Sequence, residues 1–454
     1  MTISRSRRLR CGSVAGFALL AAACVPPAIH GGSQRVEAIV SAQSGVLVSW
    51  PSNDSVAPPP IPIPAGPLAQ DSVVRLAMLR SPRVQVALAE VGLAAADLWQ
   101  ASTLPNPVLD LLYGFPASGI AVSSGSLGFG LLRALQLPLR RRVASAELAG
   151  AERRVADAVL GVMIDVQRAY IAVQHAQQLL ELRRTVVAAT AASAGAARAL
   201  RAAGNVPALL LAGEEAIAAQ SVVDESVAEG DLAQARADLA RLLGAGVADT
   251  AWTIPARLAD PAPADWPVSA MDSLAIARRL DVAAATESAR AAAGALGISE
   301  RFRLLPDGTV GLFAERDPDG RFVGPTVQVP IPLFDQGGAA VARARAQLGQ
   351  RMAIHDALVA NVHADVRARL AQLRSARQRA QQLRAVVLPL RRRVLEETER
   401  HVNAMDLTIF SLLQAKQGEV EAGRMYLDAL RDYWIARAEL ERATGGVLPQ
   451  PEPR

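Results

Sequence analysis

The pattern of hydrophobic and polar positions follows the same order of elements twice along the chain, at a separation of about 200 residues. In the first half, apolar residues at helical spacing predict a helix at 71–102, a very long helix at 140–201 and a returning helix at 208–243. In the second half, the same pattern predicts long helices at 336–401 and 409–444. Helices of this length do not fit into one compact globular domain, so the duplication predicts an elongated, quasi-symmetric molecule.

Before each long helix, bulky apolar residues alternate with small or polar ones. The alternation predicts strands at 108–115, 126–137, 310–314 and 323–331. A bulky face opposite a small or polar face is typical of strands in a membrane barrel, although a soluble hairpin with one buried face shows the same alternation. The residues predicted to face lipid are Leu109, Leu111, Tyr113, Phe115, Leu127, Phe129, Leu131, Val327 and Val329.

Four predicted strands are too few to close a barrel. A bilayer tolerates no open sheet edge, and bacterial barrels begin at about eight strands, so several chains must pool their strands. We therefore predict a mainly α fold with a small β part. It combines a transmembrane β-barrel shared between chains with a tube of long helices in the periplasm, which is hollow or solid depending on the number of helices.

The first residues predict a secretory signal and a lipid anchor. A basic segment from Arg5 to Arg10 precedes a short apolar run from Val14 to Ala23, which is too short to span a membrane as a helix. The run ends at Cys24, as in a bacterial lipobox, where the Cys becomes the lipid-bearing N-terminus. Cleavage after Ala23 without lipid and an uncleaved anchor are the alternatives.

Composition shifts divide the rest of the chain. The predicted segments are a signal peptide at 1–23, a lipid-anchored, Pro-rich extended linker at 24–67, repeat 1 at 68–247, an inter-repeat linker at 248–267, repeat 2 at 268–446 and a C-terminal tail at 447–454. The only cysteines are Cys11 and Cys24, and Cys11 leaves with the signal. The mature chain therefore has no cysteine pair for a disulfide.

Charge and chemistry exclude several classes of protein. The net charge of +5 comes almost wholly from Arg residues that alternate with Asp and Glu along the helices, which indicates solvated helix faces and predicts no nucleic-acid partner. No P-loop, His-Glu-x-x-His, paired-Cys or Gly-x-Ser-x-Gly motif occurs. His355 and His363 share a helix face without a cluster of thiols and carboxylates beside them. We therefore predict no enzymatic activity, no metal site and no cofactor apart from the N-terminal lipid.

The order of elements and several short motifs resemble the TolC-like outer-membrane efflux channels, in particular their lipidated cation and drug efflux branch. The resemblance covers about 68–446 and includes the duplication. The motifs that carry it are Leu104-Pro105-Asn106-Pro107, Gly204-Asn205-Val206-Pro207-Ala208-Leu209-Leu210, Pro330-Ile331-Pro332-Leu333-Phe334-Asp335-Gln336-Gly337-Gly338, Tyr426, Tyr433-Trp434 and Ala438-Glu439-Leu440. The resemblance implies a homotrimer in the bacterial outer membrane, with four strands per chain in a twelve-strand barrel and a long periplasmic α-helical barrel. Its helices reach through the periplasm toward an adaptor (a membrane fusion protein) and an inner-membrane pump of the resistance-nodulation-division type.

The two helical turns are the predicted docking ends. They contain Gly204, Asn205, Val206 and Pro207 in the first turn, and Asn403 and Met405 in the second. Gly204 suits the left-handed conformation that commonly ends a helix, and Asn403 is the candidate for this role in the second turn. The family usually has Gly where Met405 stands.

Some relatives narrow their pore with a ring of carboxylates near the second turn. Gln414 occupies the usual Asp position, so neither it nor Ser411 supplies that charge. The candidates for a pore constriction are Asp406, Ser411, Gln414, Glu214 and Glu215. The carboxylates among them are alternatively ordinary first-turn charges that complement a helix dipole. The competing function for the whole chain is a lipid-anchored periplasmic coiled-coil tether without channel activity.

Overall fold

The computed structural model describes residues 31–50, 62–114, 122–246, 251–262, 265–305, 307–317 and 320–449. The chain divides into two compact units. The first contains residues 1–35, 89–152 and 285–353, and the second contains 36–88, 153–284 and 354–454. Each unit draws on both halves of the sequence, so the duplication is built into both.

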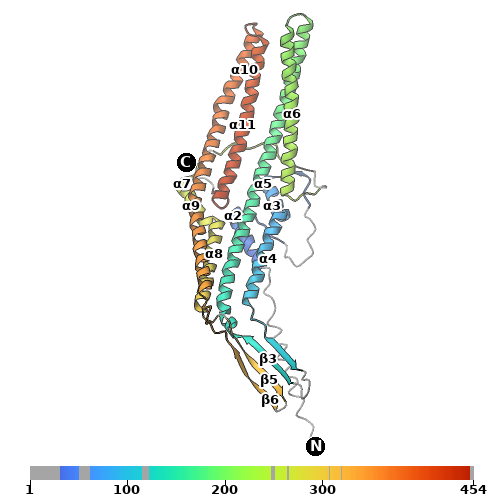
Figure 1. Cartoon of the computed structure of the whole chain (residues 1–454). Coiled ribbons are helices and arrows are strands. Elements are labelled where there is room, and N and C mark those ends of the chain that lie inside the picture. Colours follow the sequence, from blue (N-terminus) through green and yellow to red (C-terminus); the bar gives the residue numbers. More distant parts are fainter. Residues whose placement is uncertain are drawn as a thin grey trace. The chain divides into compact units, whose positions relative to one another are not determined.

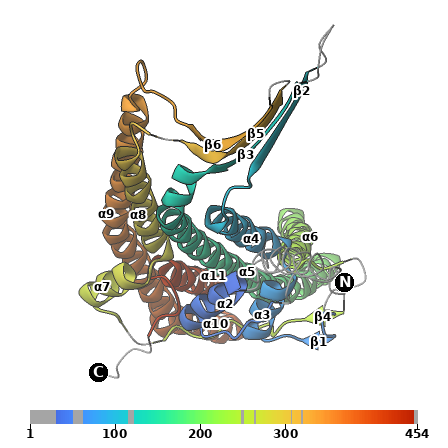
Figure 2. The same cartoon turned by 90° about the horizontal axis from the view of Figure 1, so that it is seen from below.

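The first unit contains a four-stranded antiparallel sheet (Figures 1 and 2). Its strands are β2 (Val108–Gly114), β3 (Val122–Gly130), β5 (Thr309–Asp317) and β6 (Gly320–Gln328). Their order in space is β2-β3-β5-β6, so each repeat contributes one hairpin and the two hairpins join through β3 and β5. The four strands expected from the sequence are confirmed.

The register of the sheet places the predicted apolar residues on one face. Leu109 lies opposite Leu127, and Leu127 lies opposite Leu312. In the same way Phe129 pairs with Val310, which pairs with Val327. Because side chains two residues apart along a strand share a face, Leu111 and Tyr113 join this row. Phe115 lies outside the described residues.

Two predicted strand ends are wrong. Leu131 was expected to face lipid from the second strand, but it begins helix α5, and residues 131–142 contain no β-branched residue and many strong helix formers. Val329 follows the end of β6 at Gln328. Pro330 has no N–H to extend the ladder, so the strand stops before it.

Long helices make up most of both units. They are α3 (Gln70–Arg80), α4 (Pro82–Ser102), α5 (Leu131–Ala202), α6 (Ala208–Leu242), α7 (Val268–Arg278), α8 (Leu280–Arg301), α9 (Gly338–Gln382), α10 (Leu388–Asn403) and α11 (Ile409–Ala443). The single helix expected at 71–102 is divided at Ser81, which adopts an extended backbone. Pro82 explains the break, because the ring of a proline disfavours helical geometry in the preceding residue.

Pro389 interrupts the helix predicted at 336–401, and the interruption takes the form of a π-helical turn. A five-residue π-helix, η1 (Leu383–Val387), lies between α9 and α10, directly before this proline. Proline removes one backbone donor and crowds the preceding turn, and a local change of helix type relieves that crowding.

The segment expected to be an extended linker contains a helix. Helix α2 (Gly31–Ser44) has fully buried Val36 and Val40 at helical spacing. The indole Nε1 of Trp50 donates to the carbonyl of Met78, and the amide of Val447 donates to the carbonyl of Gln43. The segment 31–44 itself contains no proline, and its i, i+4 pair of valines is buried, which explains the helix.

The core of the second unit joins the two repeats. One buried cluster groups Ile171 of repeat 1 with Leu430 of repeat 2 and Leu258 of the inter-repeat segment. A second cluster packs Leu370 and Tyr433 of repeat 2 against Trp266. Two short strands, β1 (Gly66–Pro67) and β4 (Trp252–Thr253), pair in parallel. Among the described helices, none combines the length and apolar character needed to cross a membrane.

Candidate functional site

The apolar face of the sheet is exposed. Leu111 is 77% exposed, Val323 76% and Val327 69%, although such side chains are normally buried in a protein. The opposite face is mixed. It carries Asp110 and Ser126, whose hydroxyl donates to Asp110 at 3.4 Å, together with Leu112 and Phe322, which are 70% and 52% exposed. An exposed apolar face of this size marks a surface made for another apolar phase or partner.

The sheet also has two open edges. Within the described residues, β2 pairs only with β3 and β6 only with β5. Each outer edge therefore presents a row of backbone N–H and C=O groups without partners in its own chain. In hydrocarbon each unsatisfied group costs several kcal/mol, so an edge beside this apolar face must be paired by another chain.

The turn after α5 is closed by glycine. Gly204 has φ 78° and lies in the left-handed region. The amide of Asn205 donates to the carbonyl of Leu200 at 2.9 Å, and that of Gly204 to Arg201 at 3.0 Å. This is the Schellman arrangement that satisfies the last carbonyls of a helix. Pro207 then stands directly before α6 as its N-cap residue, rather than inside its first turn.

The turn after α10 has the same hydrogen bonds without a glycine. The amide of Asp406 donates to His401 at 2.9 Å, and that of Met405 to Val402 at 3.0 Å. Met405 takes φ 62°, the only positive φ of a non-glycine among the described residues. The assignment of the left-handed role to Asn403 is therefore wrong, because Asn403 is the last residue of α10. A side chain at such a φ costs about 1–2 kcal/mol.

The candidate constriction residues separate into two groups. Near the second turn, Asp406 is exposed and pairs with His401 at 3.3 Å, Ser411 is half-buried and Gln414 is exposed. On α6, Glu214 is only 4% exposed and accepts a hydrogen bond from Ser193 at 2.7 Å.

Glu214 is therefore directed into the α5–α6 pair, which removes it from the carboxylates able to face a pore. Glu215 pairs with Arg198 at 2.7 Å. That partner makes Glu215 part of the contact between α5 and α6.

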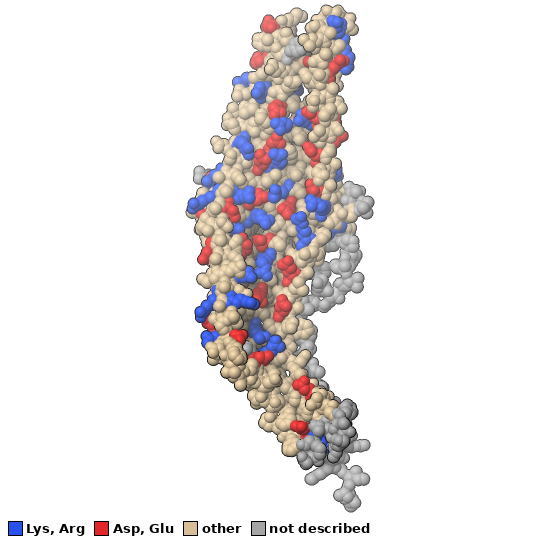
Figure 3. Space-filling view, viewed as in Figure 1, with Lys and Arg blue, Asp and Glu red and all other residues tan. Residues whose placement is uncertain are grey.

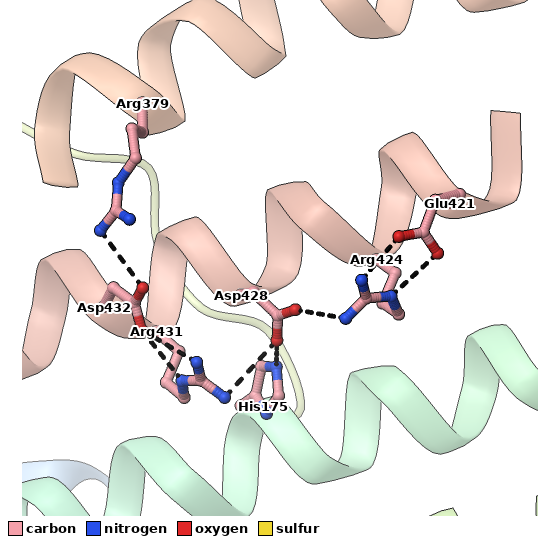
Figure 4. A network of polar contacts seen from close by, with 7 residues as sticks. All are labelled: His175, Arg379, Glu421, Arg424, Asp428, Arg431 and Asp432. Atoms are coloured by element: carbon pink, nitrogen blue, oxygen red, sulfur yellow. Dashed lines mark hydrogen bonds and ion pairs between the residues drawn. The ribbon is translucent and has the colours of Figure 1, made fainter. Parts of the chain in front are cut away.

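A network of charged residues joins the two repeats in the second unit (Figure 4). Nε2 of His175 on α5 lies 2.9 Å from Oδ1 of Asp428 on α11. Asp428 also accepts from Arg424 at 2.8 Å, and Arg431 lies 3.5 Å away. Burial, followed by the positive charge of Arg431, lowers the pKa of His175. Sequence reasoning missed this site, because no local motif links residues 253 positions apart.

The remaining charges are largely paired between or along helices. Figure 3 shows Lys and Arg intermingled with Asp and Glu over the helices, with few charges over the strands. Arg184 contacts both Glu225 and Glu229, and Arg279 contacts both Asp281 and Asp365. This mixing agrees with the expected solvated helix faces. In the described part of the chain, no three His, Cys, Asp or Glu side chains are grouped to hold a metal ion.

Comparison with known proteins finds one matching family and several solved structures of the same fold. Residues 73–245 match the model of the family described as outer membrane efflux protein, whose members are transport proteins rather than enzymes. No curated protein is significantly similar in sequence. The resemblance to TolC-like channels and the expected fold class are confirmed.

Solved structures share the fold at low sequence identity. A membrane protein from Pseudomonas aeruginosa has a TM-score of 0.71 at 20% identity, covering 86% of this chain and 100% of that one. The CmeC outer-membrane channel of Campylobacter jejuni has 0.72 at 14%, covering 83% and 85%. The open state of the Neisseria gonorrhoeae MtrE outer-membrane channel has 0.68 at 18%, covering 89% and 96%.

Replacing Met405 by glycine should stabilise the second turn. Glycine adopts φ 62° without steric cost, so we expect a gain of about 1 kcal/mol, or roughly fivefold slower local opening. Hydrogen–deuterium exchange of the amides of Met405 and Asp406 measures this opening. Met405→Ala is the control, because it removes the side chain while keeping the strained backbone. Equal slowing in both variants would show that the conformation of Met405 carries no strain.

Acid should weaken the contact between the repeats through His175. Its pKa is lowered in the folded chain, so the unfolded chain takes up a proton first. Stability is then full above about pH 6.5 and falls as the pH drops from there toward the folded pKa. We expect His175→Gln, which keeps a donor for Asp428, to lose less thermal stability between pH 7 and 5 than the wild type, by about a few degrees. His355→Gln, at a half-exposed position, is the control and should behave like the wild type. Identical acid sensitivity of all three proteins would contradict the assignment.

Proposed function

We propose that the protein is the outer-membrane channel of a tripartite efflux pump, which passively conducts substrates from the periplasmic side to the exterior. The observation that carries the proposal is the four-stranded sheet, with one face exposed and apolar and with two unpaired edges. Lipid satisfies such a face but not such edges. A barrel shared between copies satisfies both.

A homotrimer is the proposed assembly. In a ring of copies, β2 of one chain pairs with β6 of the next, which removes every edge. The face of the sheet that carries Asp110, Ser126 and Thr326 then lines the lumen. Three copies give a barrel within the usual range for the outer membrane.

The proposed partners are a periplasmic adaptor and an inner-membrane pump of the resistance-nodulation-division type. The support is the pair of helical hairpins, α5–α6 and α10–α11, whose turns expose Gly204, Asn205, Pro207 and Met405. Each turn is a short, ordered segment to which an adaptor can bind. The cargo belongs to the classes of drugs or metal cations, and its identity resides largely in the pump.

Localisation in the outer membrane is proposed to include a lipid on Cys24, which lies outside the described residues. A tether without channel activity is the weaker alternative. A tether has no use for an apolar sheet face as exposed as that around Leu111 and Val323. No feature of the described residues favours it.

The channel is tested by conductance in planar bilayers, with a pair of variants that separates the two faces of the sheet. Leu111→Arg should impair membrane insertion by about 2–4 kcal/mol, because it places a charge on the lipid face. Gly114→Arg lies on the opposite face of the same strand and should insert normally but change conductance or ion preference. Wild-type protein that inserts yet never conducts would leave the tether as the function. Equal effects of both variants would refute the assignment of the faces.

Lipid attachment is tested separately by mass spectrometry of the mature N-terminus. We expect a diacylglyceryl group on Cys24, or a triacylated form of the same residue. Cys24→Ala should lose the lipid while the barrel still inserts, because the strands carry their own apolar face. A mature chain that begins elsewhere, or a free thiol at Cys24, would disprove the anchor.

A further inference from the structure

The end of the sheet that is remote from the helices carries two arginines side by side. Strand β3 runs directly into α5, so the end of the sheet at Gly130 lies next to the helices. Gly130 is aligned with Thr309 at the start of β5, and the remote end is therefore the one at which β5 leads to β6 (Figure 1). There Arg316 of β5 lies directly opposite Arg321 of β6.

Both arginines belong to the exposed apolar face of the sheet. Arg316 comes two residues after Ala314 and therefore shares its face. Arg321 shares the face of Val323 for the same reason, and Val323 lies in one row with Ala314 and Leu111. The next row toward the remote end, here termed the donor row, consists of side chains that can donate hydrogen bonds: Tyr113, Ser123, Arg316 and Arg321.

The positive charge of the donor row is not balanced on its own face. In the described strands of this sheet, no Asp or Glu occupies a position of that face, and Asp110 and Glu315 belong to the other one. Arg316 and Arg321 are exposed, and neither forms an ion pair with a described residue. Like charges directly opposite each other on paired strands repel. An anion from outside the chain would remove this repulsion.

The arginines lie at one boundary of the apolar band. On β6, the apolar residues Val323, Pro325 and Val327 follow Arg321 on the same face. The six residues from Arg321 to Val327 span about 15 Å along the membrane normal, at about 3.3 Å per residue and the usual tilt of about 40°. Beyond the strand, Ile331 is also exposed, so the apolar surface approaches the band of about 25 Å that is typical of outer-membrane barrels. The donor row therefore lies at the level of lipid headgroups.

Phosphate is the anion that fits this position. The fork of N–H groups on a guanidinium matches the oxygens of a phosphate, and two adjacent guanidinium groups suit a headgroup with two phosphates. A lipid also has acyl chains, which the apolar residues beside the donor row can contact, such as Leu111 and Val323. A free phosphate ion would leave those side chains uncovered. Charge and apolar surface together favour a phosphate-bearing lipid.

We infer that the donor row is a binding site, one in each chain, for the phosphate groups of a lipid on the outer surface of the barrel. Arg316 and Arg321 donate to the phosphate oxygens, and the acyl chains lie along the apolar face. The inference rests on the proposed function in one respect. With the helices in the periplasm, the remote end of the sheet meets the outer leaflet, where the lipid is a phosphorylated glycolipid.

Binding of lipopolysaccharide to the full-length protein in detergent tests the site. The probe is lipopolysaccharide with both phosphates on its lipid moiety, and the comparison is the same material after enzymatic dephosphorylation. Thermophoresis measures the two dissociation constants. We expect dephosphorylation to weaken binding to the wild type at least tenfold. Arg316→Gln combined with Arg321→Gln should cause the same loss and abolish the difference between the two probes, because both changes remove one interaction.

Two control variants separate this contact from a general effect of charge. Arg391→Gln with Arg393→Gln removes two exposed arginines of α10 and should bind both probes as the wild type does. Arg316→Lys with Arg321→Lys keeps the charge without the fork and should lose less affinity than the Gln pair. Unchanged binding in the Gln pair at 316 and 321, or an equal loss in the α10 pair, would overturn the site. Displacement of the lipid by inorganic phosphate alone would overturn the assignment to a lipid.

Conductance distinguishes a failure of this inference from a failure of the proposed function. Arg316 and Arg321 are assigned to the lipid face, so their Gln variant should conduct in planar bilayers as the wild type does. A conducting wild type whose affinity for the lipid does not depend on the phosphates would disprove the site and leave the channel intact. A protein that binds the phosphorylated lipid through these arginines but never conducts would keep the site and remove the channel.

Discussion

The constraint on which the structure depends is the cost of an unpaired backbone group in hydrocarbon. A strand edge exposes a row of amides and carbonyls, and a bilayer offers none of them a partner. The sheet of the first unit has only four strands, with a continuous apolar row on one face. Once that face enters lipid, neither β2 nor β6 can remain an edge. The association of copies is then a condition of the folded state in the membrane.

The helices meet a different constraint, since water surrounds them. Within one copy, ion pairs such as Arg198–Glu215 join α5 to α6, and the His175–Asp428 pair joins α5 to α11 in addition to the apolar contact of Ile171 with Leu430. Exposed ion pairs contribute little each, but they fix register between long helices that have few aromatic residues to interlock. The small side chains of these helices allow the helices to pack closely, and the ion pairs fix their relative register.

The sequence predicted the elements better than their ends. The strand faces follow from an alternation that only a pleated strand produces, and the register confirms them. The strand prediction was wrong at Leu131 because the apolar alternation continues into a segment of strong helix formers. It was wrong at Val329 because the backbone ladder ends at Gln328, before Pro330. Helix α2 was missed because the prolines that follow it dominated the composition of the segment.

The contacts at the candidate site were less accessible from sequence. A glycine at position 204 predicts a left-handed backbone conformation there. No local sequence pattern predicts that Met405 adopts the same conformation. That conformation is imposed by the two hydrogen bonds that close the turn, which require the left-handed residue two positions after the end of α10. The pairing of His175 with Asp428 depends on the packing of α5 against α11, which no local pattern contains.

Charged contacts and apolar contacts have different roles in this chain. Charged pairs with buried members need accurate geometry, and the chain makes them within one copy, where folding brings the partners together at high effective concentration. Apolar surfaces tolerate small adjustments of position, and the chain leaves one exposed on the face of the sheet around Leu111 and Val323. Since hydrophobic association is not directional, such a face does not by itself fix the level at which two copies meet. The edges β2 and β6 supply that register, because each backbone donor and acceptor along them needs a partner in one position.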